Sequence, residues 1–174
     1  RKHNARRNAR VPMLIMNATT LNTGRNWQFT AVSMGEREPK KGTTDFDKNL
    51  FLEAFDYADF EAPEFHNTPR EKYKDVPLSV AVAASACVPG IFRPLPLTDL
   101  YPNVVPKLVD GGVQDNQGVT SILYEDCTHV IVSDASGQFD DEGKPKSAFL
   151  FALLRTKGVL EDRVRDLELE SVLS

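Results

Sequence analysis

The hydrophobic positions along the chain fall into short apolar runs separated by stretches rich in turn-forming residues. Two early runs predict strands: the compact apolar run VPMLIM at 11–16 and the aromatic and β-branched run NWQFTAVS at 26–33. Between them, NATTLNTGR gathers Asn, Thr and Gly into a turn-forming cluster. The pattern therefore predicts a hairpin or a tight reversal near the start of the chain.

The second half of the chain alternates strand and helix patterns. PLSVAVAASACVPGIF, at 77–92, begins with proline, is dense in alanine and stops at Pro89-Gly90, which predicts a buried helix running into a turn. Four further elements follow in chain order: a strand at 107–110, a short helix at 118–126, a strand at 128–135 and a helical tail within 139–174, weakened at Gly158. This alternation predicts an α/β layer fold with a mostly parallel sheet.

Residues 35–77 have a different texture and predict a long connection, because proline and glycine break both ends. Six aromatic residues lie among acids between Phe46 and Phe65, and the spacing of Phe51 and Phe55 allows a short amphipathic helix. One interpretation is a lid or wall over an apolar substrate. The interpretation we favour is a loop anchored to the core by its aromatic side chains.

Composition and charge narrow the class of protein. With 174 residues and 41% hydrophobic residues, the chain has the length of one domain and can fill a core. Residues 1–10 form a basic arm without any acid, and since the net charge is −4, the rest is about nine charges negative. We interpret the arm as a solvated segment and expect no nucleic-acid partner. The chain starts with Arg1, so we expect a piece of a longer protein.

Cysteine and histidine are sparse and lack any ligand spacing. Cys87 and Cys127 form no CxxC pair, and the three histidines form no HExxH pattern. We therefore expect neither a disulfide framework nor a metal site, and a reducing, cytoplasmic location. No GxGxxG or GxxxxGKS loop supports nucleotide binding, so no cofactor is expected. No apolar run approaches the roughly 18 to 20 residues of a membrane-spanning helix.

The stretch PKLVDGGVQDNQGV, at 106–119, places a carboxylate at a predicted strand end. Catalytic groups gather at the carboxyl ends of strands in α/β sheets, and Gly111 and Gly112 let the backbone turn sharply beside Asp110. The tripeptide alone is a weak signal, because Asp and Gly also form plain turns. Asp115 and Asn116 suggest a cation-binding loop with Asp110, but the order of an EF-hand is missing, and we expect Asn116 to cap the following helix.

If Asp110 is a base, it needs a nucleophile, for acyl transfer a serine on a strand-to-helix elbow, and no serine of this chain fits that role. The nearest match to the GxSxG elbow is AVSMG around Ser33, but the residues after it oppose the helix that an elbow requires. Ser33 is therefore expected to be a strand residue. Ser136 follows a predicted strand without elbow flanks, and Ser85 lies within the alanine-rich helix with no adjacent base in sequence.

Four segments taken together resemble a known family. LIMNATTLNTGRNWQFT, LSVAVAASACVPGIFRPL, KLVDGGVQDNQGV and VIVSDASGQ, in this order and spacing, closely resemble the carboxyl-terminal half of the catalytic domain of patatin-like phospholipases. The resemblance runs from about Val11 to Gln138. It implies that residues 1–174 are the carboxyl-terminal portion of a single domain with a three-layer α/β/α fold, a basic arm at 1–10 and a helical tail at 139–174.

The resemblance also implies a chemistry: hydrolysis of lipid acyl esters by a Ser/Asp dyad without a metal or an organic cofactor. The family's DGG motif matches Asp110-Gly111-Gly112, which makes Asp110 the expected general base. The family's nucleophile elbow and oxyanion loop precede the segment that matches LIMNATTLNTG, so the serine is expected outside these residues. A carboxylate of ordinary pKa is a weak base, so such a dyad needs shielding, here expected from the helix at 78–88 and the VPGIFRPL turn.

A rival interpretation makes the chain a non-catalytic module that binds a lipid surface or another protein through the basic arm and the aromatic segment at 46–65. The resemblance implies a lipid acyl ester as substrate and a membrane or lipid surface as a peripheral partner. The oligomeric state of the chain is not specified by the sequence.

Overall fold

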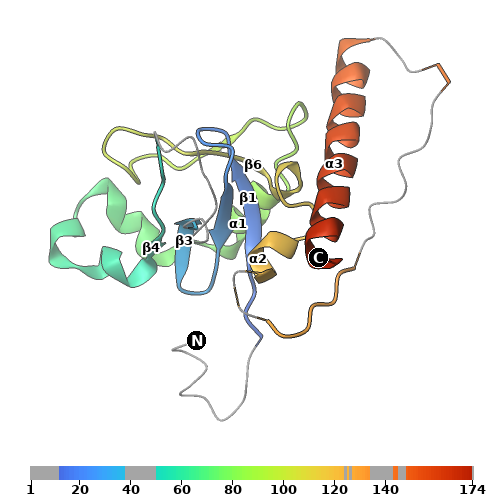
Figure 1. Cartoon of the computed structure of the whole chain (residues 1–174). Helices are drawn as coiled ribbons and strands as arrows, with labels where there is room; N and C mark the ends of the chain where they lie inside the picture. Colours follow the sequence, from blue (N-terminus) through green and yellow to red (C-terminus); the bar gives the residue numbers. More distant parts are fainter. Residues whose placement is uncertain are drawn as a thin grey trace.

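The structure, a computed structural model, describes residues 12–37, 50–123, 125, 127–133, 143–144 and 148–173. A six-stranded sheet in the order β4-β3-β2-β1-β6-β5 forms its centre (Figure 1). The strands are β1 (Met16–Thr20), β2 (Asn26–Phe29), β3 (Ser33–Glu36), β4 (Phe55–Asp56), β5 (Leu95–Pro96) and β6 (Lys107–Asp110).

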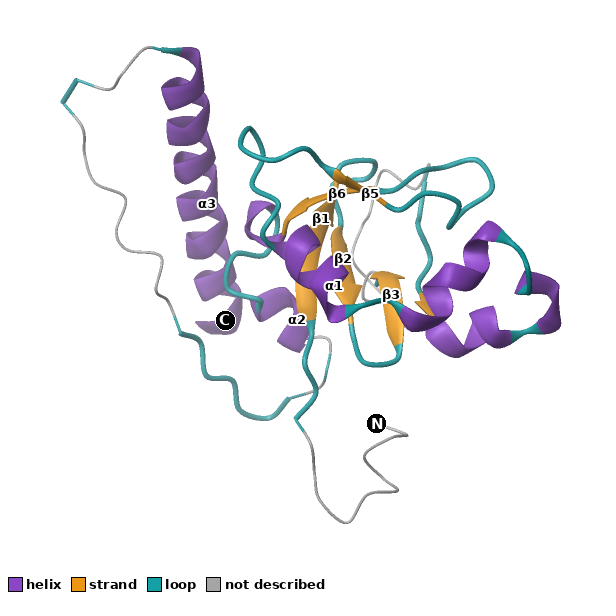
Figure 2. Cartoon of the chain, turned by 180° about the vertical axis from the view of Figure 1, so that it is seen from behind, coloured by secondary structure: helices purple, strands orange, loops and turns teal. Residues whose placement is uncertain are grey.

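Helices surround this sheet. The α-helices are α1 (Leu78–Ser85), α2 (Val119–Leu123) and α3 (Phe149–Leu173). The 3-10 helices are η2 (Tyr57–Glu61), η3 (Pro63–Phe65), η4 (Pro69–Asp75) and η5 (Gly111–Val113). Seen from behind, α1 lies across the sheet, the 3-10 helices η2 to η4 form a lobe at the β4 edge, and α3 stands at the opposite side (Figure 2).

The sheet is antiparallel, which corrects the expectation of a mostly parallel one. Every pair of neighbouring strands in the described sheet runs antiparallel. For β1, β2 and β3 the reason is the length of the connections: only residues 21–25 join β1 to β2 and only residues 30–32 join β2 to β3. Parallel neighbours need a crossover of about a dozen residues or more, which these turns cannot supply. The mixed α/β class is confirmed.

The predicted hairpin is confirmed as β1–β2. Met16 pairs with Phe29 and Thr19 with Asn26, and the turn closes through the Thr20 N–H bonded to Arg25 O at 3.0 Å. Gly24 takes φ +71° in this turn, a conformation that glycine adopts without strain. The strands are shifted from the predicted ranges, since β1 continues into the residues expected to turn.

Side chains of the central strand β1 alternate between an apolar face and a polar face of the sheet. Met16 and Ala18 lie opposite Phe29 and Trp27 on the face that α1 covers. The alternate residues, such as Asn17, belong to the other face. The buried core cluster lies on the first face and in the adjoining lobe: Ala18, Trp27, Phe29, Met34, Leu52, Phe60, Tyr73, Ala81, Ala84, Leu97, Leu100 and Leu108. Each large apolar side chain in it contributes about 1.5–3 kcal/mol relative to exposure.

The aromatic segment packs into the molecule, as the favoured interpretation predicted. Phe60 is fully buried, and its ring lies 5.5 Å from Phe55, 5.4 Å from Phe65 and 5.9 Å from Tyr73, centroid to centroid. The amphipathic helix predicted at Phe51 does not form, because Phe55 instead begins β4. Phe46 lies outside the described residues.

The remaining predictions vary in outcome. The helix at 77–92 and the strand at 107–110 are confirmed as α1 and β6, and the short helix at 118–126 is present as α2. The strand at 128–135 is wrong over 128–133, where the structure has no strand, and its last two residues lie outside the described part. None of the helices in the described part is long and apolar enough to cross a membrane.

Candidate active site

Asp110 is the last residue of β6, at the strand end where the sequence placed it. Its backbone N–H donates to Cys87 O at 2.9 Å, just after α1, and its carbonyl accepts from Thr19 Oγ1 on β1 at 2.9 Å. Its carboxylate Oδ1 accepts from the Gly112 N–H at 2.7 Å. Backbone and side chain are therefore both fixed, by contacts from α1, from β1 and from the residue's own turn.

The two glycines after Asp110 permit close approaches of other chain segments. A Cβ on Gly111 would lie 2.5 Å from the Asn17 carbonyl oxygen of β1. A Cβ on Gly112 would lie 2.7 Å from Asn116 Oδ1 and 3.0 Å from Asp110 Oδ1. These glycines were expected to form a sharp turn, and the structure adds that Gly111 is needed for the fit of the turn against β1.

A cavity of about 290 Å³ opens beside this turn. Asp110 and Ser85 both line it, although they are 25 positions apart in sequence. Its other lining residues come from the start of β1 and from the loop after β6: Ile15, Met16, Asn17, Gly111, Gly112, Asp115, Asn116 and Gly118. Within the described residues, Asp110 Oδ2 accepts no hydrogen bond, so this oxygen is available to a group that enters the cavity.

The serines considered as nucleophiles have different positions. Ser33 is the first residue of β3, as expected, and its hydroxyl lies 3.0 Å from Thr30 Oγ1. Ser85 ends α1 and is the serine that the fold brings to the cavity of Asp110. Ser136 lies outside the described residues.

Shielding of Asp110 comes from one of the two predicted sources. The residues just after α1 reach it through Cys87, whereas the following turn contributes no residue to the lining of the Asp110 cavity, and its Ile91 and Phe92 are 57% and 59% exposed. A different element contributes instead: α3 packs along η5, with Glu161 Oε1 3.3 Å from the Cβ position of Gly112. Lys157 pairs with Glu161 at this place.

Asp115 has a structural role that the sequence did not predict. It is 3% exposed, and its carboxylate accepts hydrogen bonds from Thr120 N at 3.4 Å and Ser121 N at 3.3 Å. Asp115, and not Asn116 as predicted, thus caps the first turn of α2. The sequence allowed this cap to be predicted, because Asp115 precedes the start of the helix by the few residues that a capping side chain can span.

A buried polar network extends from Asp115 across the polar face of β1 and β2. Asp115 Oδ2 accepts from Asn17 and Asn26, each at 3.3 Å, and Ser121 Oγ donates to Asn17 Oδ1 at 2.8 Å. Gln28 Nε2 donates to Ser121 Oγ at 2.8 Å. These bonds leave Asp115 little capacity for a cation, and within the described part no group of three or more His, Cys, Asp or Glu side chains can hold a metal ion.

Comparison with known proteins gives one match. The family model described as patatin-like phospholipase matches residues 7–123, which include β1 to β6, α1 and the Asp110 turn. No curated protein and no solved structure matches the chain.

Proposed function

The chain belongs to the patatin-like phospholipase family, and on that basis we propose that it is part of a serine hydrolase that cleaves lipid acyl esters with Asp110 as general base. Membership of the family gives the class of reaction and a lipid substrate. The Ser/Asp dyad, the assignment of Asp110-Gly111-Gly112 as its DGG motif and the role of this chain within a longer protein are parts of the proposal.

The observation that carries the proposal is the way Asp110 is held. Its backbone is fixed to α1 and β1, and Gly112 N–H occupies Oδ1, while Oδ2 has no partner in the described residues and the side chain lines a cavity. A general base needs a fixed orientation and one lone pair free to accept a proton. A turn-forming Asp at an ordinary surface would need neither.

The proposed reaction has two steps. Asp110 accepts the hydroxyl proton of the serine while the serine oxygen attacks the acyl carbonyl carbon. The ester C–O bond then breaks, and the departing alcohol takes the proton from Asp110. Water attacks the acyl-enzyme and gives its proton to Asp110, which passes it to the serine oxygen as the fatty acid leaves. Atoms and protons balance, and Asp110 ends as a carboxylate.

The nucleophile is proposed to come from a segment outside these 174 residues, which would then be the carboxyl-terminal portion of a single catalytic domain. The support is the lack of a GxSxG elbow followed by a helix in the sequence. For the complete domain we propose the three-layer α/β/α arrangement of the family. The described part agrees with it, because α1 lies on one face of the sheet and the α2 residue Ser121 bonds to side chains of the other face.

The rival proposal of a non-catalytic lipid-surface or protein-interaction module has less support. It used the aromatic segment as a surface, whereas Phe60 is fully buried and Phe65 packs against it. The basic arm at 1–10 lies outside the described residues. We propose a cytoplasmic location with peripheral contact to lipid, because an acyl hydrolase of this class would meet its substrate there.

The deciding experiment compares Asp110→Asn with the unchanged full-length protein. Hydrolysis of a p-nitrophenyl acyl ester should fall by about 10²- to 10⁴-fold, because the serine loses its base. The melting temperature should stay within a few degrees, since Asn keeps the Oδ1 acceptor for Gly112 N–H. The matched control is Asp99→Asn, an exposed aspartate paired with Lys72, which should keep full activity. Turnover by Asp110→Asn close to that of the unchanged protein would refute the assignment.

A second measurement locates the nucleophile. A fluorophosphonate probe should label one serine of the full-length protein, and peptide mapping should place it outside the 174 residues. Ser85→Ala should leave that labelling intact. If the label falls on Ser85, this serine of the Asp110 cavity is the nucleophile, and the proposal of an external serine is wrong.

A further inference from the structure

Helix α3, which stands beside the sheet, carries apolar residues on the side that faces away from the rest of the protein (Figure 1). Phe149, Leu160 and Leu167 are 84%, 60% and 54% exposed. On the side toward η5, the charged Glu161 has its Oε1 3.3 Å from the Cβ position of Gly112. A surface helix typically shows the reverse arrangement, with apolar residues toward the core and charged residues toward water. The outer face of α3 therefore lacks the covering that its composition favours.

The leucines of this face follow a spacing that is typical of helix pairing. Leu153, Leu160 and Leu167 lie seven residues apart, the repeat that keeps side chains on one face of a helix over several turns. Val159, next to Leu160 in sequence, is 48% exposed. Leu153 contacts the Gly90 turn and is 40% exposed. The leucine row thus begins at that turn and continues along the outer face of α3.

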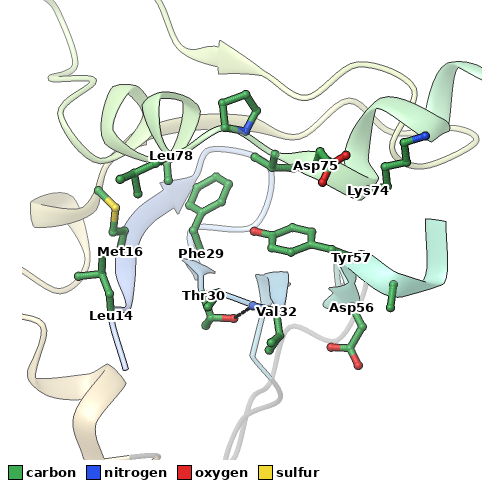
Figure 3. A pocket seen from close by; sticks show the side chains of 15 residues that line it. Leu14, Met16, Phe29, Thr30, Val32, Asp56, Tyr57, Lys74, Asp75 and Leu78 are labelled. Carbon is green, nitrogen blue, oxygen red and sulfur yellow. Dashed lines mark hydrogen bonds between the residues drawn. The ribbon is translucent and has the colours of Figure 1, made fainter. Parts of the chain in front are cut away.

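Exposed apolar residues of α1 have a different explanation. Leu78 is 63% exposed, but it borders a cavity of about 810 Å³ that Met16 and Phe29 also line (Figure 3). Its exposure therefore belongs to the wall of a cavity. Among the described residues, none from α3 lines this cavity or the cavity of Asp110. The leucine row of α3 is instead an outward surface, which a partner can cover.

The charges along α3 change sign from one end to the other. Residues 149–157 have two bases and no acid, and residues 166–173 have three acids and no base: Arg155 and Lys157, then Asp166, Glu168 and Glu170. The last turn thus carries an acid where the helix dipole favours a base. A second α3 running in the opposite direction would place each basic end beside an acidic end. The charge pattern is therefore complementary to itself in an antiparallel pair.

A lipid surface is a less suitable occupant of the outer face. Helices that lie on membranes carry a polar face rich in Lys and Arg, which anionic headgroups attract. In α3, five acids outnumber four bases. Asp166 and Glu170 are exposed on the helix, so its carboxyl-terminal end repels such headgroups.

We infer that the outer face of α3 binds α3 of a second copy of this chain, in an antiparallel pair with a two-fold axis at Leu160. This alignment sets Leu160 opposite its own copy and Leu153 opposite Leu167 of the other copy. A two-fold pair uses the same surface on both subunits and closes on itself. An interface of one helix from each copy falls below the roughly 1,200 Å² of stable complexes, so we expect a dissociation constant in the micromolar range and a monomer at high dilution.

Sedimentation equilibrium of the 174-residue chain tests the pairing. The mass should rise from that of a monomer to that of a dimer as the concentration passes through the micromolar range, and the full-length protein should do the same. A monomer at every concentration would overturn the inference. A dimer of the 174-residue chain together with a monomeric full-length protein would also overturn it, because a segment of the longer protein would then cover α3.

Two leucines of similar exposure locate the interface. Leu160→Glu should weaken the dimer by at least about tenfold, because each carboxylate would lose water at the axis and meet its own copy. Leu78→Glu makes the same change on α1 and should alter the dissociation constant less than about twofold, as an exposed site away from the interface. Circular dichroism should show that both variants keep their helices. Equal effects of the two substitutions would overturn the site.

Phosphatidylcholine vesicles test the alternative occupant with the same variants. Neither the unchanged chain nor Leu160→Glu should float with the vesicles. Flotation of the unchanged chain that Leu160→Glu abolishes, without a dimer in solution, would assign the face to lipid and refute the pairing.

A double charge reversal, Asp166→Lys with Glu170→Lys, tests the complementarity. It raises the net charge from −4 to 0, since each substitution adds two positive charges, and a net charge near zero by itself promotes association. The dimer should nevertheless weaken by about fivefold or more, because two basic ends would then meet. Unchanged or tighter association would refute the antiparallel arrangement.

Disulfide trapping tests the direction of the pair. Cys127 is exposed, so both trapping variants also carry Cys127→Ser. Leu160→Cys should give a disulfide-linked dimer on mild oxidation. Leu167→Cys should not, because the antiparallel alignment separates its two copies by about 21 Å along the helices, at about 1.5 Å per residue, which a disulfide cannot span. Linkage of both variants would indicate a parallel pair, and linkage of neither would exclude pairing through this face; either result would overturn the inference.

Discussion

At the scale of single residues, the candidate site depends on the absence of a side chain at Gly111. Gly111 has no positive φ, so backbone conformation is not the reason for glycine. The reason is the Asn17 backbone, whose carbonyl oxygen would lie 2.5 Å from a Cβ. Because that neighbour is backbone of the central strand, it cannot move aside as a flexible side chain would. The residue beside the expected base thus couples the position of Asp110 to β1.

Gly111→Ala should therefore destabilise the protein by about 1–3 kcal/mol, the usual cost of forcing an extra carbon into a packed site. Chemical denaturation of the variant measures this. The control is Gly143→Ala, where a Cβ would meet nothing within 4 Å, and whose effect should stay within about 0.5 kcal/mol. If both variants are equally stable, β1 and the Asp110 turn are less tightly packed than the structure has them.

Residue-level prediction from sequence succeeded where the signal is local and failed where it is not. Asp110 was expected at a strand end, and the short run KLV before it, with the apolar Leu108 and Val109, was enough to place it there. The shared cavity of Asp110 and Ser85 was missed, because their proximity depends on the packing of α1 against the sheet. Asp115 was considered as a cation ligand, and its actual partners Asn17 and Asn26 were missed because they lie 98 and 89 positions away in sequence.

At the scale of elements, the lobe of η2 to η4 contains the buried Tyr73 and the half-buried Tyr57. Tyr73 is 6% exposed, its hydroxyl donates to Thr98 O at 2.6 Å, and burial, helped by the negative Asp99, raises its pKa to about 12. Burial likewise raises the pKa of Tyr57 to about 12, and burial together with Glu36 and Glu53 raises that of Tyr101. The lobe therefore packs with neutral tyrosines, and ionising them opposes folding.

The stability of the chain should consequently fall in alkali. An unfolded tyrosine ionises near pH 10, while Tyr57 and Tyr73 stay protonated in the folded state up to about pH 12. Their contribution is complete below pH 10 and is lost as the pH rises from 10 to 12, because the unfolded state binds fewer protons there. Urea denaturation across this range, with tyrosinate absorbance at 295 nm, measures the effect.

Tyr73→Phe gives the matched control for the alkaline experiment. Loss of the hydrogen bond to Thr98 should cost about 1 kcal/mol at neutral pH, whereas the fall between pH 10 and 12 should become shallower, because one ionising group is gone. A steeper fall in the variant, or equal stability of the unchanged chain at pH 8 and pH 11.5, would contradict the burial of these rings.

The type of each element was easier to predict from the sequence than the pairing of the strands. Aromatic, apolar and alanine-rich runs identified β2, β6 and α1, because these patterns are local. The direction of pairing was inferred from the alternation of strands and helices, and that inference was wrong, since the short turns around β2 enforce antiparallel neighbours. The strand expected at 128–135 is absent over 128–133, the part of it that the structure describes.

At the scale of the whole molecule, stability should be concentrated in the sheet and the lobe and not in α3. The buried core cluster includes no residue of α3, and this helix exposes Phe149, Leu160 and Leu167 by more than half. Ion pairs within the helix, Lys157 with Glu161 and Arg165 with Asp162, support it locally and help it continue through Gly158. The described contacts of α3 with the rest of the protein are few and lie at α2, η5 and the Gly90 turn.

Two leucine truncations test this distribution of stability. Leu108 in β6 is fully buried, so Leu108→Ala should cost about 2–5 kcal/mol. Leu153 in α3 lies against the Gly90 turn but is 40% exposed, so Leu153→Ala should cost less than about 1 kcal/mol. Both changes remove the same atoms, so chemical denaturation compares the two environments directly. Hydrogen exchange should agree, with amides of α3 exchanging by local opening before those of β1. Equal costs, or equal protection of α3 and β1, would mean that α3 unfolds with the sheet as one unit, and the Asp110 turn beneath it would then be covered for as long as the protein is folded.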